Sequence, residues 1–378
     1  MKNTRVAWLL TSAFYYWQPS LSCYSQLFPD TTVFTSRWHG FAPGLEDSFR
    51  VEILGDRQII SLRKSANSYG DNFTYLPLNI VKRLLQFKPD LIFSNSFGVW
   101  TILAILFKPI GGWRVVIAYE GSSPGVDYRN SPLRLAIRRG MVKAADACIT
   151  NSHGGKNYLI EILNAKENQV FVHPYEVPWV QSLGTPDRDL KSTYSQKLTF
   201  LFVGVIIPRK GLSYLLEACA ILQKQGETNY QLWVVGDGEQ RQELETFCQH
   251  NQLTNYVRWF GRVEYNNLAT YFTQADIFVL PTLEDTWGMV VLEAMVLGRP
   301  ILCSELAGAS ELITDGENGY CFHPQQPEYL AELMTRFIHN PELARLMGMR
   351  SQKLMNNYTP QAAANFLNQV TSFIFPNS

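Results

Sequence analysis

The sequence carries no excess charge of either sign and is poor in charged residues overall. Its 378 residues include 33 Lys plus Arg and 33 Asp plus Glu, so the formal net charge is zero and charged residues make up 17%. The chain as a whole is therefore not expected to attract nucleic acid electrostatically, and nucleic acid is not an expected partner. Hydrophobic residues reach 46%, which is too many for a disordered chain, and the length predicts two domains.

Paired cysteines and long apolar runs are also missing. The six cysteines stand alone, with no CxxC pair, at Cys23, Cys148, Cys219, Cys248, Cys303 and Cys321. They predict buried free thiols in a reducing compartment and argue against a structural zinc. The longest apolar run, 97–107, has eleven residues, too few for a membrane-spanning helix. The apolar stretch 6–10 lacks a following cleavage site and predicts a first strand, so we expect a cytoplasmic protein.

The common nucleotide fingerprints are absent as well. A predicted strand at 230–235 leads into Gly236-Asp237-Gly238, but Arg241 stands where a third glycine would complete GxGxxG. No GxxxxGK[ST] sequence occurs, so a P-loop is excluded. These absences disfavour a nicotinamide-dependent dehydrogenase.

Short apolar strands alternate with helical patterns in both halves of the chain. The strand candidates are 6–10, 32–34, 51–54, 91–93, 115–118, 147–150, 170–173, 199–205, 230–235, 257–260, 277–280, 301–303 and 320–322. This alternation predicts βαβ units and an α/β fold of two Rossmann-like, doubly wound lobes facing a central cleft. We expect an N-terminal domain over 1–180, a linker over 181–197 and a C-terminal domain over 198–356. A last helix within 357–378 is expected to pack back on the first domain.

The most informative segment follows the strand at 277–280. It begins Pro281-Thr282-Leu283-Glu284-Asp285-Thr286-Trp287-Gly288-Met289 and continues through Glu293-Ala294-Met295 to Gly298-Arg299-Pro300. This pattern resembles the donor-site signature of retaining glycosyltransferases of the GT-B fold, family 4. The two acidic positions of that signature are eight apart and correspond to Asp285 and Glu293. The family usually has Glu at the first of them, where this chain has Asp285.

Elementary electrostatics agrees with a donor site here. A helix is predicted over 286–297. Its N-terminus, near Trp287, Gly288 and Met289, offers free N–H groups and partial positive charge to a diphosphate. The resemblance implies that Glu293 accepts hydrogen bonds from ribose hydroxyls and that Asp285 contacts the donor sugar, which makes Asp285 our first catalytic candidate. The alternative is that the acidic residues at this helix N-terminus only interact favourably with the helix dipole and bind no ligand.

Two further segments resemble the same family. Gly204 and the run Pro208-Arg209-Lys210-Gly211 follow the strand at 199–205, and the resemblance implies that Lys210 contacts the donor phosphates. Val205 stands where the family often has Arg, and Arg209 is the candidate replacement; a solvated basic turn is the alternative. Arg262 and Val263 resemble the loop that packs on the nucleotide base, although an ordinary strand end explains them nearly as well.

The N-terminal half matches the family weakly. Glu120 follows a strand where the acceptor cleft is expected, and it is our second catalytic candidate; an ordinary acidic loop residue is the alternative. His153 also follows a strand end and could contact the acceptor or have a structural role. Tyr16 and Trp17 could stack on an acceptor sugar or pack in the core. The basic, amphipathic stretch 129–143 could contact an anionic membrane peripherally, or pack its apolar side on its own sheet.

The resemblance implies a retaining, metal-independent glycosyltransferase without a cofactor. In it, the domain over 1–180 would bind the acceptor and the domain over 198–356 would bind the nucleotide-sugar donor. It would move a sugar from a nucleotide-diphospho-sugar to a glycan, a lipid-linked or another hydroxyl acceptor, in the cytoplasm or at the inner membrane face. No DxD triplet for Mg²⁺ is evident. Two alternatives stay open: a nucleotide-sugar 2-epimerase of the same fold, and a catalytically decayed binding scaffold.

Overall fold

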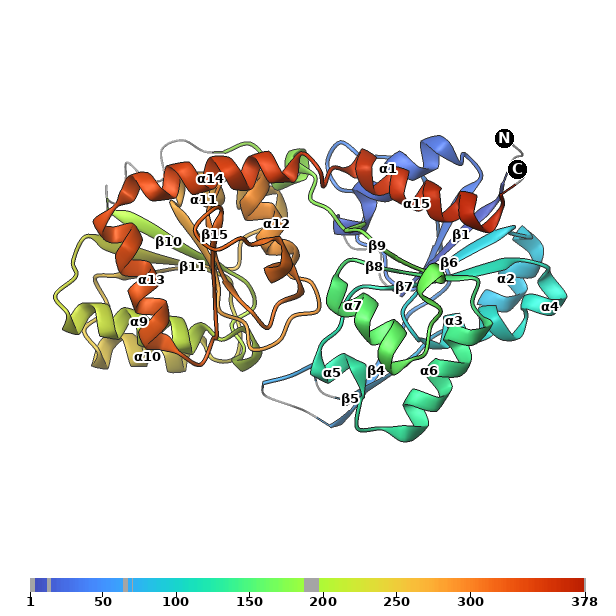
Figure 1. The fold of residues 1–378 in the computed structure, drawn as a ribbon, viewed down its shortest axis with the longest axis horizontal. Helices are drawn as coiled ribbons and strands as arrows, with labels where there is room; N and C mark the ends of the chain where they lie inside the picture. Colours follow the sequence, from blue (N-terminus) through green and yellow to red (C-terminus); the bar gives the residue numbers. More distant parts are fainter. Residues whose placement is uncertain (1–3, 12–14, 64–66, 70, 187–196, 377–378) are drawn as a thin grey trace. The chain divides into compact units, whose positions relative to one another are not determined.

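The chain forms two compact units, each built around its own sheet. The computed structural model describes residues 4–11, 15–63, 67–69, 71–186 and 197–376. The N-terminal lobe comprises Met1–Lys64, Gly70–Val177 and Tyr358–Ser378, and the C-terminal lobe comprises Ser65–Tyr69 and Pro178–Asn357. Each lobe holds a parallel sheet with helices on both faces, so the predicted pair of Rossmann-like lobes is confirmed (Figure 1).

The N-terminal lobe is organised on a seven-stranded sheet of order β3-β2-β1-β6-β7-β8-β9. Its strands are β1 (Val6–Leu10), β2 (Thr31–Thr35), β3 (Arg50–Ile53), β6 (Leu91–Asn95), β7 (Arg114–Tyr119), β8 (Ala147–Thr150) and β9 (Val170–Val172). Its helices are α1 (Gln18–Leu27), α2 (Ile80–Phe87), α3 (Val99–Leu106), α4 (Lys108–Gly111), α5 (Pro124–Asp127), α6 (Pro132–Ala144), α7 (His153–Asn157) and α15 (Pro360–Ile374). All pairings in this sheet are parallel.

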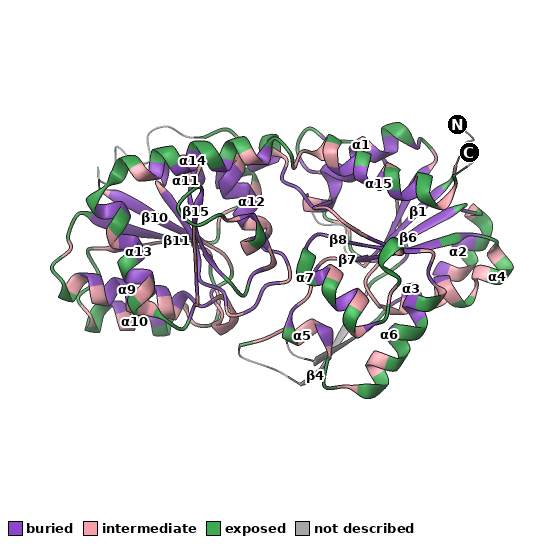
Figure 2. Cartoon of the chain, viewed as in Figure 1, coloured by how far each residue is buried: buried purple, intermediate pink, exposed green. Residues whose placement is uncertain are grey.

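Alternation along β1 divides this core into two layers. Val6, Trp8 and Leu10 pack among residues of α1 and α15, whereas Ala7 and Leu9 pack among residues of α2 and α3. Successive side chains of a strand point to opposite faces, so a fully apolar strand must be covered on both sides. The strands are accordingly buried and the outer helix faces exposed (Figure 2).

One element of the N-terminal lobe was not predicted. An antiparallel hairpin joins β4 (Gln58–Arg63) to β5 (Asp71–Tyr75) outside the main sheet. Adjacent apolar residues in β4 and mixed residues in β5 break the period of two that would indicate strands.

The C-terminal lobe carries a six-stranded parallel sheet of order β12-β11-β10-β13-β14-β15. Its strands are β10 (Leu198–Val203), β11 (Tyr230–Val235), β12 (Val257–Gly261), β13 (Ile277–Leu280), β14 (Ile301–Ser304) and β15 (Gly319–Phe322). Its helices are α9 (Leu212–Lys224), α10 (Arg241–His250), α11 (Leu268–Gln274), α12 (Met289–Val296), α13 (Pro327–His339) and α14 (Pro341–Met355). The helix predicted to start at Thr286 begins only at Met289, after a left-handed Gly288.

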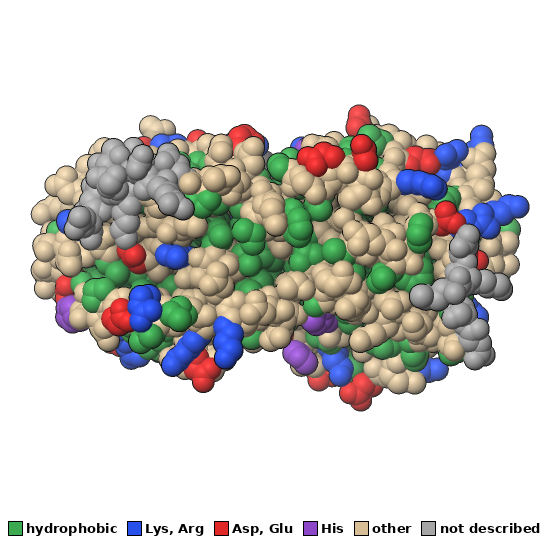
Figure 3. Space-filling view, turned by 90° about the horizontal axis from the view of Figure 1, so that it is seen from above, with side chains coloured by type: hydrophobic (Ala, Val, Ile, Leu, Met, Phe, Trp, Pro, Cys, Tyr) green, Lys and Arg blue, Asp and Glu red, His purple; other side chains and the backbone are tan. Residues whose placement is uncertain are grey.

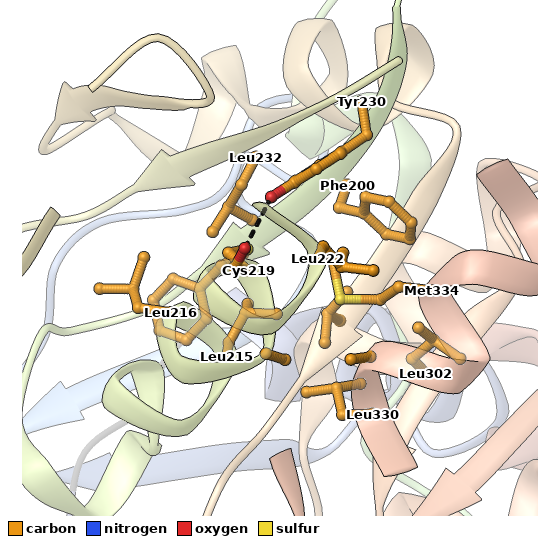
Figure 4. Close-up of a cluster of buried hydrophobic side chains, with 14 of the residues drawn as sticks. Phe200, Leu215, Leu216, Cys219, Leu222, Tyr230, Leu232, Leu302, Leu330 and Met334 are labelled. Atoms are coloured by element: carbon orange, nitrogen blue, oxygen red, sulfur yellow. Dashed lines mark hydrogen bonds between the residues drawn. The ribbon is translucent and has the colours of Figure 1, made fainter. Parts of the chain in front are cut away.

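Aliphatic side chains from α9 and α13 seal one face of this sheet. Leu216 and Leu222 of α9 and Met334 of α13 pack against Phe200 and Tyr230 of the sheet (Figure 4). The Tyr230 hydroxyl donates a hydrogen bond to the Cys219 carbonyl oxygen at 3.0 Å, which satisfies the polar end of a buried ring. All six cysteines are free thiols.

The segment between the lobes differs from the predicted linker. Residues 178–186 belong to the C-terminal lobe and include a 3-10 turn, η4 (Val180–Leu183), while 187–196 lie outside the described residues. The last helix, α15, returns to the N-terminal lobe and packs on α1.

None of the helices in the described ranges is long and apolar enough to cross a bilayer. Acidic and basic side chains are interspersed on the face seen in Figure 3.

Candidate functional site

Two loops of the C-terminal lobe meet at the carboxyl ends of β10 and β13. The first loop ends in a 3-10 turn, η5 (Pro208–Lys210), and the second is 281–288. The Thr282 hydroxyl donates to the Arg209 carbonyl oxygen at 3.0 Å, and the Leu283 N–H donates to the same oxygen at 2.8 Å. The Arg209 guanidinium in turn donates to the Glu284 carbonyl oxygen at 2.7 Å. These bonds fix the two loops to each other.

The locked loops bring together two side chains that are 75 residues apart in sequence. Lys210 Nζ lies 2.5 Å from Asp285 Oδ2, and both side chains are largely buried. The Asp285 backbone is held from a third side, because its N–H donates to the Leu306 carbonyl oxygen and its carbonyl oxygen accepts from the Gly308 N–H. The predicted residues Arg209, Lys210 and Asp285 thus form one cluster.

The approach of the loops depends on Gly211, which adopts φ +68°. A Cβ atom at this position would lie 1.9 Å from the Pro281 carbonyl oxygen. We expect Gly211→Ala to destabilise the protein by about 3 kcal/mol in urea unfolding, through backbone strain plus this clash. The matched control is Gly226→Ala, which has φ +83° but no atom within 4 Å of the added Cβ; it should cost only about 1 kcal/mol. Equal losses in the two variants would contradict a role for the loop contact.

The N-terminus of α12 and Glu293 form the second part of the site. Gly288, at φ +97°, turns the chain into α12, whose first N–H groups have no acceptor within the helix. Glu293 is 6% exposed, and its Oε1 accepts a hydrogen bond from the Tyr265 hydroxyl at 3.0 Å. Burial raises the pKa of Glu293 to about 7, so this carboxyl group titrates near neutral pH. Met289 is half-buried at the first helical position.

Trp287 does not offer its ring to a ligand. Its side chain is 2% exposed and packs in the core of the lobe, and its indole N–H has no hydrogen-bond partner in the described structure. The Trp287 carbonyl oxygen accepts from the Ala309 N–H at 2.6 Å. Any contact from Trp287 and Gly288 to a ligand must therefore come from the backbone.

Tyr69 belongs to this site and was missed by sequence reasoning. It belongs to the C-terminal lobe; its N–H donates to Glu284 Oε2 at 3.1 Å and its hydroxyl to Asp285 Oδ1 at 3.4 Å. The Arg209 guanidinium lies 4.0 Å from the centre of its ring. Burial and the Asp285 carboxylate raise the pKa of the Tyr69 hydroxyl well above its usual range. A lone tyrosine more than 130 residues from Arg209 gives no sequence signal for this contact; Tyr265, beside Glu293, was missed for the same reason.

The remaining donor-site candidates lie at neighbouring strand ends. Gly204 directly follows β10, and a Cβ atom on Gly236 would lie 1.9 Å from the Gly204 carbonyl oxygen, so the ends of β10 and β11 approach closely. Arg262 is exposed and Val263 half-buried just beyond β12. In the described part of the chain, no hydrogen bond or ion pair joins Arg262 to Asp285 or Glu293.

In the N-terminal lobe, Glu120 lies near a second carboxyl group, that of Glu176. The sequence analysis identified Glu120 as a candidate but missed Glu176. Glu120 follows β7 and accepts a hydrogen bond from the Asn95 side-chain amide at 3.2 Å. Near it, Glu176 is 1% exposed and accepts from Asn151 at 2.9 Å, while its second oxygen has no partner in the described structure. Burial, reinforced by Glu120, raises the pKa of Glu176 well above its usual range. Burial therefore disfavours the charged form of the Glu176 carboxyl group.

The three acceptor-side candidates differ in how far they are buried. Trp17 is fully buried, with its ring 5.7 Å from Trp8 and 5.2 Å from Tyr175, which is the core-packing alternative. Tyr16 precedes it in a 3-10 turn, η1 (Tyr15–Trp17), and is half-buried. His153 is exposed at the first position of α7.

The basic stretch 129–143 largely coincides with α6. Met141 and Val142 pack on the lobe's own sheet, whereas Leu133 and Ile137 remain 73% and 47% exposed. The helix thus anchors itself with one side and leaves apolar side chains on the other.

Comparison with known proteins gives a consistent assignment for both lobes. Residues 186–354 match the family model described as "Glycosyl transferases group 1", and residues 30–175 match "Glycosyltransferase Family 4". The chain is 29% identical over 166 residues to alpha-D-kanosaminyltransferase of Streptomyces kanamyceticus, covering 44% of this chain and 41% of that protein. It is 25% identical over 299 residues to sulfoquinovosyl transferase SQD2 of Arabidopsis thaliana, covering 75% and 56%. The matches to the curated relatives span about half of their length.

Solved structures share the fold over nearly the whole chain. HepE of Anabaena in complex with UDP superposes with a TM-score of 0.76 at 16% identity, over 98% of this chain and 100% of that one. Sucrose-phosphate synthase of Thermosynechococcus elongatus gives 0.73 at 19% identity, over 99% and 100%.

Proposed function

The chain belongs to the group 1 glycosyltransferases of the GT-B fold, and we propose that it transfers a sugar from a nucleotide-diphospho-sugar to an acceptor hydroxyl. The observation that carries the proposal is the Lys210–Asp285 pair, held where η5 meets the loop leading into α12. A cation and a helix N-terminus at one place match the charge that develops on a pyrophosphate leaving group.

Each donor-site residue has a role that follows from its surroundings. Lys210 and Arg209 would hold the diphosphate, together with backbone N–H groups at the start of α12. The buried Glu293 carboxylate would accept hydrogen bonds from ribose hydroxyls, as its bond from Tyr265 illustrates. Asp285 would orient the donor sugar and keep Lys210 in place before the donor binds. Crystals of HepE, which shares this fold, hold UDP or UDP-glucose, and UDP is therefore the first nucleotide to test.

The finer features of the reaction are part of this proposal. We propose a retaining transfer without a metal ion, with the diphosphate charge balanced by Lys210 and Arg209. The acceptor would be bound by the N-terminal lobe, where the Glu120 and Glu176 carboxyl groups lie near each other at the carboxyl ends of parallel strands.

A nucleotide screen by thermal unfolding tests the donor assignment directly. We expect one of UDP, GDP, ADP, CDP and dTDP to stabilise the protein by about 2.7 kcal/mol at a hundredfold excess over its Kd. The shift should persist in EDTA, and a sugar-donor panel for the stabilising base should then yield transferred product. No shift with any nucleotide would favour a decayed scaffold, and a free epimerised sugar nucleotide formed without acceptor would favour an epimerase.

A further inference from the structure

A cavity lies beside β3, the strand at one edge of the N-terminal sheet. It has a volume of about 770 Å³, within the range of small-molecule sites. Its walls are formed by α1, the turn before β2, the loop 36–49 and β3 itself. Because β3 pairs only with β2, no further strand of the described sheet covers this side.

The cavity is separate from the Glu120 and Glu176 carboxyl groups. Glu120 follows β7, and β3 lies four strands from β7 in the sheet order β3-β2-β1-β6-β7. Neighbouring strands are about 4.8 Å apart, so these two strands are about 19 Å from each other. In the described structure, no residue that lines the cavity forms a hydrogen bond or ion pair with either carboxyl group. A ligand that reaches both places must therefore be longer than one sugar unit.

Three aromatic side chains of the loop 36–49 line the cavity. The ring centre of Trp38 lies 5.0 Å from that of Phe41 and 6.2 Å from that of Phe49, and the Phe41 and Phe49 centres are 5.1 Å apart. All three pairs meet edge to face. Phe49 is buried, whereas Trp38 and Phe41 are only half-buried. The rings therefore offer an aromatic surface on which the C–H face of a sugar ring can pack.

The part of the loop that carries Trp38 and Phe41 is held in place by Gln18 of α1. The Gln18 side chain is fully buried, and its amide group donates to the Gly40 carbonyl oxygen at 2.9 Å. Its amide oxygen accepts a hydrogen bond from the Ala42 N–H at 2.6 Å. These two bonds flank Phe41 along the chain, so the aromatic surface is formed before a ligand binds. Such preorganisation lowers the cost of binding.

Polar side chains of the lining have unused hydrogen-bonding capacity. Ser25 is 8% exposed, and its hydroxyl oxygen, like that of Ser48, is buried and has no hydrogen-bond partner in the described structure. A buried hydroxyl without a partner lowers stability, so native proteins seldom keep one. The exposed Asp47 carboxylate likewise forms no hydrogen bond or ion pair with the described residues. A ligand rich in hydroxyl groups supplies both the donors and the acceptors that these three side chains can use.

The charges at the cavity are balanced. Its charged lining residues are Asp47 and Arg50, one of each sign. Arg50 is exposed, and its guanidinium lies 3.9 Å from a carboxylate oxygen of Asp30. The remaining lining includes the apolar Val51 and the 58% exposed Ile53 of β3. Aromatic rings, hydroxyl groups and balanced charge together fit a neutral polyhydroxyl molecule better than an ion or a purely apolar chain.

We propose that this cavity binds one sugar unit of a neutral oligosaccharide, with the sugar ring on Trp38 and its hydroxyl groups toward Ser25, Ser48 and Asp47. The proposal rests on the proposed function, because the oligosaccharide would be the acceptor or the elongated product of sugar transfer. The unit held at β3 would be remote from the hydroxyl that reacts near Glu120. The cavity would thus favour acceptors long enough to span both places.

Binding of the full chain to an array of immobilised neutral oligosaccharides tests the proposal. We expect the wild type to bind at least one of them, and Trp38→Ala to lower that affinity about tenfold or more, as loss of an aromatic anchor typically does. Asp47→Asn should weaken binding several-fold while leaving the aromatic packing intact, since Asn tolerates the left-handed φ of +54° at this position. The matched control is Glu46→Gln, on the same loop but outside the cavity lining, which should change the affinity less than twofold.

Two comparisons separate the cavity from the acceptor site and from the proposed function. Glu120→Gln should weaken oligosaccharide binding less than Trp38→Ala does; the reverse order would overturn the cavity assignment. Nucleotide binding, measured by thermal unfolding, should be the same in Trp38→Ala as in the wild type. Oligosaccharide binding that depends on Trp38, without binding of any nucleotide, would support the cavity and contradict the proposed function. Nucleotide binding without oligosaccharide binding, or equal losses in Asp47→Asn and Glu46→Gln, would overturn the cavity assignment alone.

Discussion

Lys210→Met is expected to lower kcat/KM for sugar transfer by at least about a hundredfold. Loss of a single preorganised group that stabilises developing charge typically costs that much. Nucleotide affinity should fall in the same variant, because the ammonium group would contact the diphosphate before and during bond cleavage. Product formation under initial-rate conditions and calorimetric nucleotide binding are the two measurements. Lys224→Met, an exposed lysine at the end of α9, is the matched control and should keep full activity.

The same substitution has a structural cost that must be separated from catalysis. Removing Lys210 leaves Asp285, only 8% exposed, without the ion pair it forms in the folded protein. Breaking one side of a buried pair costs about 3 kcal/mol, most of which is the penalty of an unpaired charge. Lys210→Met/Asp285→Asn should therefore recover much of the stability while staying inactive. A double variant that regains both stability and activity would contradict the role of Lys210 at the diphosphate.

Glu293→Gln is expected to make the protein more stable and less able to bind nucleotide. The folded-state pKa of Glu293 is about 7, raised from 4.5 by burial, so the folded protein holds a proton there that the unfolded chain releases. Stability therefore falls as pH rises from about 4.5 to 7 and stays low above that range. The cost at pH 8 is about 3 kcal/mol, and the glutamine variant should regain up to that amount.

The same substitution is expected to weaken nucleotide binding, although it stabilises the fold. A carboxylate that accepts hydrogen bonds from ribose hydroxyls contributes about 1.5–3 kcal/mol for charged bonds, so the variant should bind nucleotide at least tenfold more weakly. Wild-type affinity should also decline as pH falls below about 7, because Glu293 becomes protonated. Urea unfolding at pH 5 and pH 8, with nucleotide titrations at the same values, provides the test. The exposed Glu332→Gln is the control; identical pH profiles for wild type and Glu293→Gln would refute the assignment.

The donor half of the site could be predicted because its parts are local in sequence. Gly288, the start of α12 and Glu293 lie within one strand–loop–helix unit. Their spacing along the chain therefore fixes their positions relative to one another. The helix start was misplaced by three residues because the loop 285–288 is held by backbone bonds to 306–309, which lie on another loop. Acidic residues are typical of helix N-termini, so Glu284 and Asp285 favoured an earlier start of the helix than the structure shows.

The sequence by itself determined the α/β class, the division into two lobes, the family and the positions of Lys210, Asp285 and Glu293. These depend on periodicity and on motifs, in which each residue's neighbours along the chain supply the information. Only the tertiary structure decided that Lys210 pairs with Asp285, that Tyr69 covers both Asp285 and Arg209, that Glu176 joins Glu120, and that Trp17 is core. The physical reason is that parallel strands from distant parts of the chain end at one edge of a sheet, and burial there sets both the contacts and the protonation of side chains.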